Sequence, residues 1–284
     1  MNATVTTVPP GQALRDLLAR PAILEQPAVC DPLTARLARD AGYEAVTLTG
    51  PAIGAHLPAG SAADLDDVER AASAVVTACA VPLLLDADAL WGDAAALAAA
   101  VTRLDAAGVA AIGVSSQYLP DHAPVSLRAE RRCAHADLLQ RVRTACAARK
   151  HALVMARCDV IGELGYGDAR ERAAALLAAG ADGILVHTAY EDDLRRLPQD
   201  LPGATLICTG SPTAGCEQAF FAPDVLERWG FSAISNKYHR CYCSRLKPVT
   251  RRASAPKGLQ AARRRKADSA LYTIVDRPQR EGTT

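Results

Sequence analysis

The chain has 284 residues, of which 50% are hydrophobic, 4% aromatic and 22% charged, with 19 glycines and 17 prolines. This length allows about two domains of roughly 150 residues or one α/β barrel of about 250 residues. The apolar content excludes a disordered chain, and the modest glycine and proline content excludes a collagen-like one. Ala, Val and Leu dominate the apolar residues, which favours helices packed on buried parallel strands over an antiparallel sandwich.

Membrane and secretion signals are not found in the sequence. It has no run of about 18 apolar residues, and residues 1–12 lack the charged start and apolar core of a secretory signal. We therefore predict a cytoplasmic protein that does not engage a membrane. The nine cysteines, at positions 30, 79, 133, 146, 158, 208, 216, 241 and 243, form no CxxC pair and no zinc-finger spacing. They are predicted to be reduced and mostly buried.

The net charge of +1 conceals a basic C-terminal segment. Residues 237–266 contain eleven Lys or Arg and no Asp or Glu, which leaves 21 basic and 31 acidic residues elsewhere, a net charge of −10. Such a segment binds phosphate-rich partners or packs against an acidic neighbouring subunit. Because no nucleic-acid-binding motif appears, nucleic acid is not the expected partner. We predict a homo-oligomer, a dimer or tetramer, whose interface includes residues 238–246.

Short apolar runs alternate with longer amphipathic stretches through residue 236. Strands are predicted at residues 27–30, 45–49, 82–87, 109–115, 152–158, 183–188, 204–209 and 231–236. Helices are predicted at residues 32–41, 64–79, 93–107, 129–149, 168–179, 191–197 and 223–229. The fold class that this order predicts is α/β, a (β/α)8 TIM-type barrel at residues 1–236 with a C-terminal helical extension at residues 237–284. An open doubly wound sheet is the alternative.

Polar residues gather where the predicted strands end, which is where a barrel of this kind has its functional site. Those singled out are Thr49, Gly50, Asp86, Asp88, Ser115, Arg157, His187, Thr188 and Asn236. The pattern predicts a site for a small, polar, anionic ligand.

Asp86 and Asp88 leave a predicted buried strand two residues apart, so both side chains lie on the same side. Two carboxylates in this arrangement favour a hard cation such as Mg²⁺, held partly through water. The alternative is that both carboxylates have structural roles: Asp88 caps the loop, and Asp86 accepts hydrogen bonds from the backbone.

Arg157 and His187 end two consecutive predicted strands. The planar guanidinium binds a carboxylate or phosphate through two hydrogen bonds, and the imidazole is a second donor or a proton carrier near neutral pH. Alternatively, Arg157 forms an ion pair with Asp159 or Asp182, and His187 is a satisfied core histidine.

Six segments carry a family resemblance. In chain order they are LRDLLA, CDPLTARLARDAGYEAVTLTG, VPLLLDADALWGD, LDAAGVAAIGVSSQ, ALVMARCDV and AGADGILVHT. Over roughly residues 12–236 the chain resembles the isocitrate lyase and phosphoenolpyruvate mutase superfamily. The resemblance implies a (β/α)8 barrel, usually a tetramer that exchanges a C-terminal helix, using Mg²⁺ to stabilise the enolate of a small 2-oxo acid.

The resemblance also implies roles for single residues. Asp86 and Asp88 match the two aspartates of the family's DAD motif, with Asp86 as the direct metal ligand. Arg157 matches the arginine that binds a substrate carboxylate or phosphonate.

Two further segments match the family's substrate site. His187 and Thr188 resemble the mutase branch, which has a histidine here, and Thr49 with Gly50 matches the turn that holds the oxo acid.

Three departures from the family pattern affect the expected chemistry. Ser115 and Ala59 stand where the family has acidic residues, one of them in the metal shell, so Mg²⁺ is expected to have fewer acidic supports. The loop after the fourth strand reads YLPDHAPVSLRAERRC, without the family's lysine or cysteine at the matching place. Asp121 and His122 are the nearest proton carriers, and cleavage of isocitrate or methylisocitrate by the usual route is not expected.

These observations predict a lyase or mutase that forms or breaks a C–C or P–C bond next to a small 2-oxo acid or dicarboxylate. The expected catalytic residues are Asp86, Arg157, His187 and His122. The expected substrate-binding residues are Thr49, Gly50, Asp88, Ser115, Arg157, His187, Thr188 and Asn236, and the metal ligands are Asp86 and Asp88.

The alternative is a divergent, metal-independent member that serves as a binding or accessory protein, or that has a new activity using Cys30 or Cys158. Pairing of Asp86 with a lysine or arginine would favour the accessory role.

Overall fold

The computed structural model describes residues 8–58, 61, 63–86, 92–115, 117–118, 131–132, 134–158, 165–186, 191–210 and 221–236. For residues 117, 118, 131, 132, 210 and 236 it describes the backbone alone. The chain divides into two compact units, Met1–Cys243 and Ser244–Thr284, and every described residue lies in the first.

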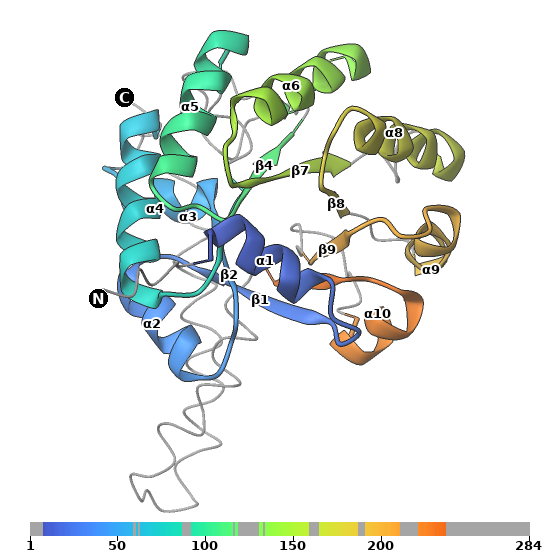
Figure 1. The fold of residues 1–284 in the computed structure, drawn as a ribbon, viewed down its shortest axis with the longest axis horizontal. Coiled ribbons are helices and arrows are strands. Elements are labelled where there is room, and N and C mark those ends of the chain that lie inside the picture. Colours follow the sequence, from blue (N-terminus) through green and yellow to red (C-terminus); the bar gives the residue numbers. More distant parts are fainter. Residues whose placement is uncertain are drawn as a thin grey trace, which may run out of the picture. The chain divides into compact units, whose positions relative to one another are not determined.

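Eight parallel strands close into a barrel in the order β1, β2, β3, β4, β7, β8, β9, β10 and back to β1 (Figure 1). They are β1 (Leu24–Val29), β2 (Val46–Thr49), β3 (Leu83–Asp86), β4 (Ala111–Val114), β7 (Leu153–Cys158), β8 (Gly183–Val186), β9 (Leu206–Gly210) and β10 (Ala233–Asn236). The predicted TIM-type barrel is therefore confirmed. The open doubly wound sheet is wrong, because β1 pairs with β10 and closes the sheet.

Helices follow the strands and surround the barrel in Figure 1. They are α2 (Pro32–Asp40), α4 (Leu65–Cys79), α5 (Ala94–Ala106), α6 (His135–Ala148), α8 (Tyr166–Ala178), α9 (Glu191–Asp200) and α10 (Pro223–Trp229). The ends of α2 show why the sequence folds this way. The Asp31 carboxylate accepts the Thr34 N–H at 2.7 Å in a capping box, and Gly42 follows at φ +93°. Within the described residues, no helix is both long and apolar enough to cross a membrane.

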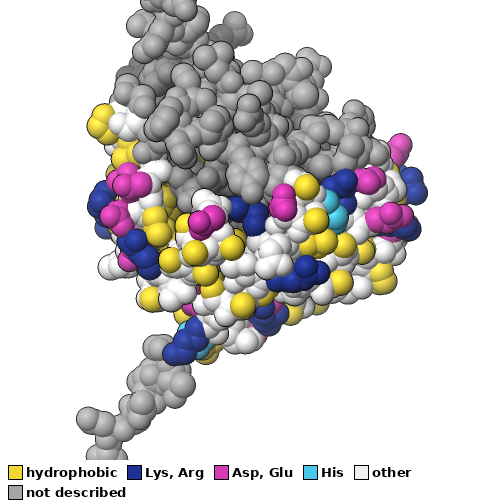
Figure 2. All heavy atoms as spheres, turned by 90° about the horizontal axis from the view of Figure 1, so that it is seen from above, with side chains coloured by type: hydrophobic (Ala, Val, Ile, Leu, Met, Phe, Trp, Pro, Cys, Tyr) yellow, Lys and Arg dark blue, Asp and Glu magenta, His cyan; other side chains and the backbone are white. Residues whose placement is uncertain are grey.

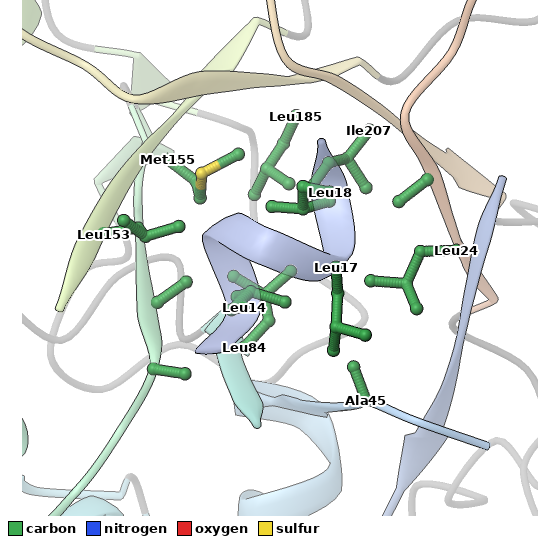
Figure 3. Close-up of a cluster of buried hydrophobic side chains, with 13 residues drawn as sticks. Leu14, Leu17, Leu18, Leu24, Ala45, Leu84, Leu153, Met155, Leu185 and Ile207 are labelled. Atoms are coloured by element: carbon green, nitrogen blue, oxygen red, sulfur yellow. The ribbon is translucent and has the colours of Figure 1, made fainter. Parts of the chain in front are cut away.

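Helix α1 (Pro10–Leu18) covers the end of the barrel where the strands begin. Proline suits its first turn, where no N–H is needed, and its leucines recur at spacings of three and four. Figure 3 shows Leu14, Leu17 and Leu18 among buried side chains of the strands, including Leu84 and Met155. This apolar cluster closes one end of the barrel, so a ligand has to enter at the opposite, carboxyl end.

The structure corrects two predicted boundaries. The helix expected at residues 129–149 begins only at His135, because Arg131–Arg132 (β6) pairs antiparallel with Gln117–Tyr118 (β5) after β4. Strand β1 begins at Leu24, and Pro27 lies inside it rather than at its start. The fixed φ of proline suits extended backbone, although Pro27 donates no ladder hydrogen bond.

Candidate active site

The alternation of side chains decides which strand residues face the barrel interior. The cluster at the closed end contains Leu24, Ala45, Leu84, Ala111, Met155, Ile207 and Ala233. Residues two positions later on each strand face the same way, nearer the carboxyl end. These residues are Gln26, Thr47, Asp86, Gly113, Arg157, Thr209 and Ser235. Two residues further on, Thr49 and Ser115 lie at the carboxyl ends of β2 and β4.

Asp86 is the last residue of β3, and its side chain is 1% exposed. It pairs in register with Thr49 of β2 on one side, and its carboxylate leans towards β4 on the other. A Cβ on Gly113 would lie 3.1 Å from Asp86 Oδ1, which is tighter than nine in ten real Cβ contacts. The carboxylate therefore occupies space that a side chain at position 113 would take.

Arg157 projects from β7 and is 7% exposed. Its Nη1 lies 3.8 Å from Asp86 Oδ1. Strands β3 and β7 are both neighbours of β4, so the ion pair spans the inner face of β4 above Gly113. Asp86 and Arg157, the two residues with the most specific predicted roles, therefore lie close together inside the barrel.

The alternative partner Asp182 for Arg157 is wrong. Asp182 pairs with Arg15 of α1 at 2.6 Å and with Arg149, and it accepts the Val154 N–H at 2.9 Å. These contacts lie at the closed end of the barrel, because Arg15 belongs to the helix that covers that end.

Thr49 has a fixed hydroxyl at the end of β2. Its Oγ1 accepts the Ala52 N–H at 3.3 Å as the cap of the short helix α3 (Gly50–Gly54). The hydroxyl therefore keeps its own hydrogen to donate. Gly50 begins α3 and Pro51 follows it, so residue 51 offers no N–H. Ser115 follows β4 and is buried.

The remaining predicted site residues are not placed. Asp88, His122, His187, Thr188 and Ala59 lie outside the described residues, and Asn236 ends β10 with only its backbone described. Among the described residues, no three or more His, Cys, Asp and Glu side chains gather in a way that could hold a metal ion. Of the two predicted metal ligands, Asp86 is the one that lies within the described residues.

Of the cysteines in the described part of the chain, Cys30 and Cys208 have raised pKa values and Cys158 turns away from the site. Cys158 Sγ lies 3.7 Å from the Ala169 carbonyl oxygen of α8, on the outer side of β7, because Arg157 has the inward position. This placement argues against the alternative activity that would use Cys158. Burial, followed by the charge of Asp31, raises the pKa of Cys30. Burial raises the pKa of Cys208 to about 12. A raised pKa disfavours the reactive thiolate.

Sequence reasoning missed the interior residues that shape the site. Gly113 and the polar residues Gln26, Thr47 and Ser235 all lie on inner faces of strands. The alternation of each strand could have found them, since Leu24, Gln26 and Ala28 share one face of β1.

Comparison with known proteins gives the family. A family model described as phosphoenolpyruvate phosphomutase matches residues 14–245. The chain belongs to the isocitrate lyase and phosphoenolpyruvate mutase superfamily. Within this superfamily, it is 31% identical over 237 residues to the probable 2-methylisocitrate lyase 1 of Corynebacterium glutamicum, covering 78% of this chain and 74% of that protein.

Two solved structures share the fold of this superfamily member. Oxaloacetate acetylhydrolase in complex with 3,3-difluorooxalacetate has a TM-score of 0.73 and 21% identity, covering 94% of this chain and 95% of that one. Phosphonopyruvate hydrolase in complex with oxalate and Mg²⁺ has a TM-score of 0.69 and 24% identity, covering 94% and 100%. The family assignment makes the protein an enzyme of the lyase or mutase class.

Proposed function

We propose that this superfamily member is a lyase that breaks a C–C bond next to a small 2-oxo acid or dicarboxylate, through an enolate. The observation that carries the proposal is the buried pair of Asp86 and Arg157 at the open end of the barrel. It places one cation and one anion where a small acid has to bind.

Arg157 is the residue that binds the carboxylate of the substrate. A buried guanidinium is stabilised by anionic groups, and Asp86 Oδ1 lies 3.8 Å from its Nη1. A substrate carboxylate offers two oxygens that match the planar fork. The Thr49 hydroxyl supplies a further donor for an anionic oxygen at the end of β2.

Asp86 fits a magnesium site of the kind in which the ion keeps several waters. Mg²⁺ is often held by only one or two carboxylates, and Asp86 is a buried oxygen ligand at a strand end. Asp86 would hold the ion, with Asp88 as the second carboxylate. When bound, Mg²⁺ supplies positive charge that stabilises an enolate oxygen. His122 and His187 remain the predicted proton carriers.

One observation favours the second candidate, a metal-independent binding or accessory protein. Arg157 already neutralises Asp86, and Ser115 replaces an acidic residue that the family resemblance leads one to expect. In that case the pair is a structural ion pair, and the site binds an anion without turning it over.

The test is a turnover assay of the full chain with Mg²⁺. Its substrates are 2-methylisocitrate, oxaloacetate and phosphonopyruvate, the compounds in the names of the compared proteins. We expect C–C cleavage of at least one acid, and Asp86→Asn should lower kcat about 10²- to 10³-fold. The control is Arg228→Lys, which changes an exposed ion pair with Asp224. Turnover of phosphonopyruvate alone would assign the mutase-like chemistry, and oxalate binding without any turnover would assign the accessory role.

A further inference from the structure

Three uncharged polar side chains lie on the inner faces of β1, β2 and β10. Gln26, Thr47 and Ser235 are each 0% exposed. The Thr47 and Ser235 hydroxyl oxygens lie 3.0 Å apart and share a hydrogen bond. Buried polar groups of this kind are normally paired, so each of the three requires a partner.

The hydroxyl pair fixes where these side chains meet. Thr47 belongs to β2 and Ser235 to β10, and β1 lies between those strands. The two hydroxyls therefore meet across the inner face of β1. Gln26 pairs in register with Ser235, and Ala28 pairs with Thr47, so Gln26 lies on that same face.

The inner face of β1 is partly exposed next to these residues. Ala28 follows Gln26 on the inner face of β1, carries only a methyl group and is partly exposed. Thr49, two residues beyond Thr47, is in register with Asp86. Thr47 is thus one inward-facing position deeper than Thr49 and Asp86.

The amide of Gln26 is the unsatisfied group. Neither its Nε2 nor its Oε1 has a hydrogen-bond partner among the described residues. The amide presents two donors and an acceptor, and the Thr47 and Ser235 pair retains one hydrogen and further lone pairs. All three residues are neutral, so they match a neutral O–H group better than an anion.

We propose that Gln26, Thr47 and Ser235 form a buried subsite for one hydroxyl group on the inner face of β1. The O–H group comes either from an ordered water molecule or from a hydroxyl substituent of a bound organic acid. The second source rests on the proposed function, whereas the first does not. An O–H group accepts from the Gln26 amide N–H and donates to its carbonyl oxygen or to a hydroxyl.

The first test is a crystal structure of the full chain without ligand and with malate. We expect density for an oxygen atom within hydrogen-bond distance of the Gln26 amide in both crystals. No density there in either crystal would overturn the subsite, whatever the protein's activity.

A stability measurement tests the same subsite in solution. Replacing a truly unsatisfied amide by an apolar side chain of similar size should stabilise the protein, by about 2 to 4 °C in Tm. We expect Gln26→Met not to raise Tm, because it discards a satisfied hydrogen-bond site. Ser235→Ala should likewise not raise Tm. The matched control is Leu84→Met, an interior swap without a polar group. A clear rise in Tm for Gln26→Met alone would contradict the proposal.

Malate and succinate, which differ by one hydroxyl, identify the source of the O–H group. A tighter affinity for malate, by about tenfold, that disappears in Gln26→Met would assign the ligand hydroxyl. Equal affinities, with the water density retained in the malate crystal, would assign the water.

Discussion

Asp86 and Arg157 reach each other across β4 because Gly113 leaves the inner face of that strand without a side chain. The glycine is needed here for close approach, since its backbone has no positive φ. The site therefore depends on the absence of a side chain at position 113 as much as on the charges of Asp86 and Arg157.

A methyl group at position 113 should disturb Asp86. In Gly113→Ala the new Cβ would meet Asp86 Oδ1 at 3.1 Å and the Leu85 carbonyl oxygen at 3.3 Å. We expect a loss of about 1 to 3 kcal/mol in the free energy of unfolding, with weaker Mg²⁺ binding in titration calorimetry. Gly167→Ala, where nothing lies within 4 Å, is the control. Unchanged Mg²⁺ affinity in Gly113→Ala would separate Asp86 from the metal site.

Arg157→Lys keeps the charge but loses the planar fork. We expect the affinity for oxalate to fall by about 1 to 3 kcal/mol, the range for hydrogen bonds to charged groups. Titration calorimetry measures it, with Arg228→Lys as the exposed control. An equal affinity in wild type and Arg157→Lys would place the anion site elsewhere.

At the scale of elements, the sequence predicted every strand of the barrel, because each is a short apolar run bounded by turn residues and helix caps. Asp31 and Gly42 bound α2 as their types lead one to expect. Helix α1 was not predicted, because its leucines pack against residues of several strands that are distant in the sequence. No local sequence pattern indicates that packing. The pair of β5 and β6 was missed because its two-residue strands are defined only by their pairing.

The site was predictable in part for the same reason. Asp86, Arg157 and Thr49 follow from the rule that function lies at the carboxyl ends of strands. The contact between Asp86 and Arg157 depends on strand order and on Gly113, which sequence spacing does not encode.

The charge of Asp31, the N-cap residue of α2, should make the free energy of unfolding depend on pH. The Thr34 N–H bond, assisted by His56 3.8 Å away, lowers the pKa of Asp31. Ionised Asp31 therefore stabilises the fold above its unfolded pKa of about 3.9, and this contribution is lost as the pH falls through the lower folded pKa. Asparagine still caps a helix, so Asp31→Asn removes mainly the charge.

We expect Asp31→Asn to lose about 0.3 to 1 kcal/mol at pH 7 and progressively less below pH 4, measured by thermal unfolding. A difference between variant and wild type that stays constant from pH 7 to pH 2.5 would contradict this account.

At the scale of the whole molecule, charge is distributed unevenly along the sequence, with a net −10 outside residues 237–266. On the described part of the face drawn in Figure 2, acidic and basic side chains are interspersed. The basic segment lies outside the described residues, so its role stays a prediction from the sequence.

Docking of this basic segment on an acidic neighbour predicts a homo-oligomer. Light scattering of the full chain should give at least a dimer, and truncation after Asn236 should give a monomer. A monomer in both cases would reject subunit exchange, and an oligomer in both would place the interface on the barrel.

The central claim is that Asp86 holds a cation beside an anion bound by Arg157, and Mg²⁺-dependent binding of oxalate tests it most directly. Titration calorimetry of the full chain with oxalate should show binding that strengthens when millimolar Mg²⁺ is added. In Asp86→Ala the dependence on Mg²⁺ should disappear, while weak binding of oxalate by Arg157 remains. Oxalate affinity that is independent of Mg²⁺ in the wild type, or dependent on it to the same degree in Asp86→Ala, would contradict the account.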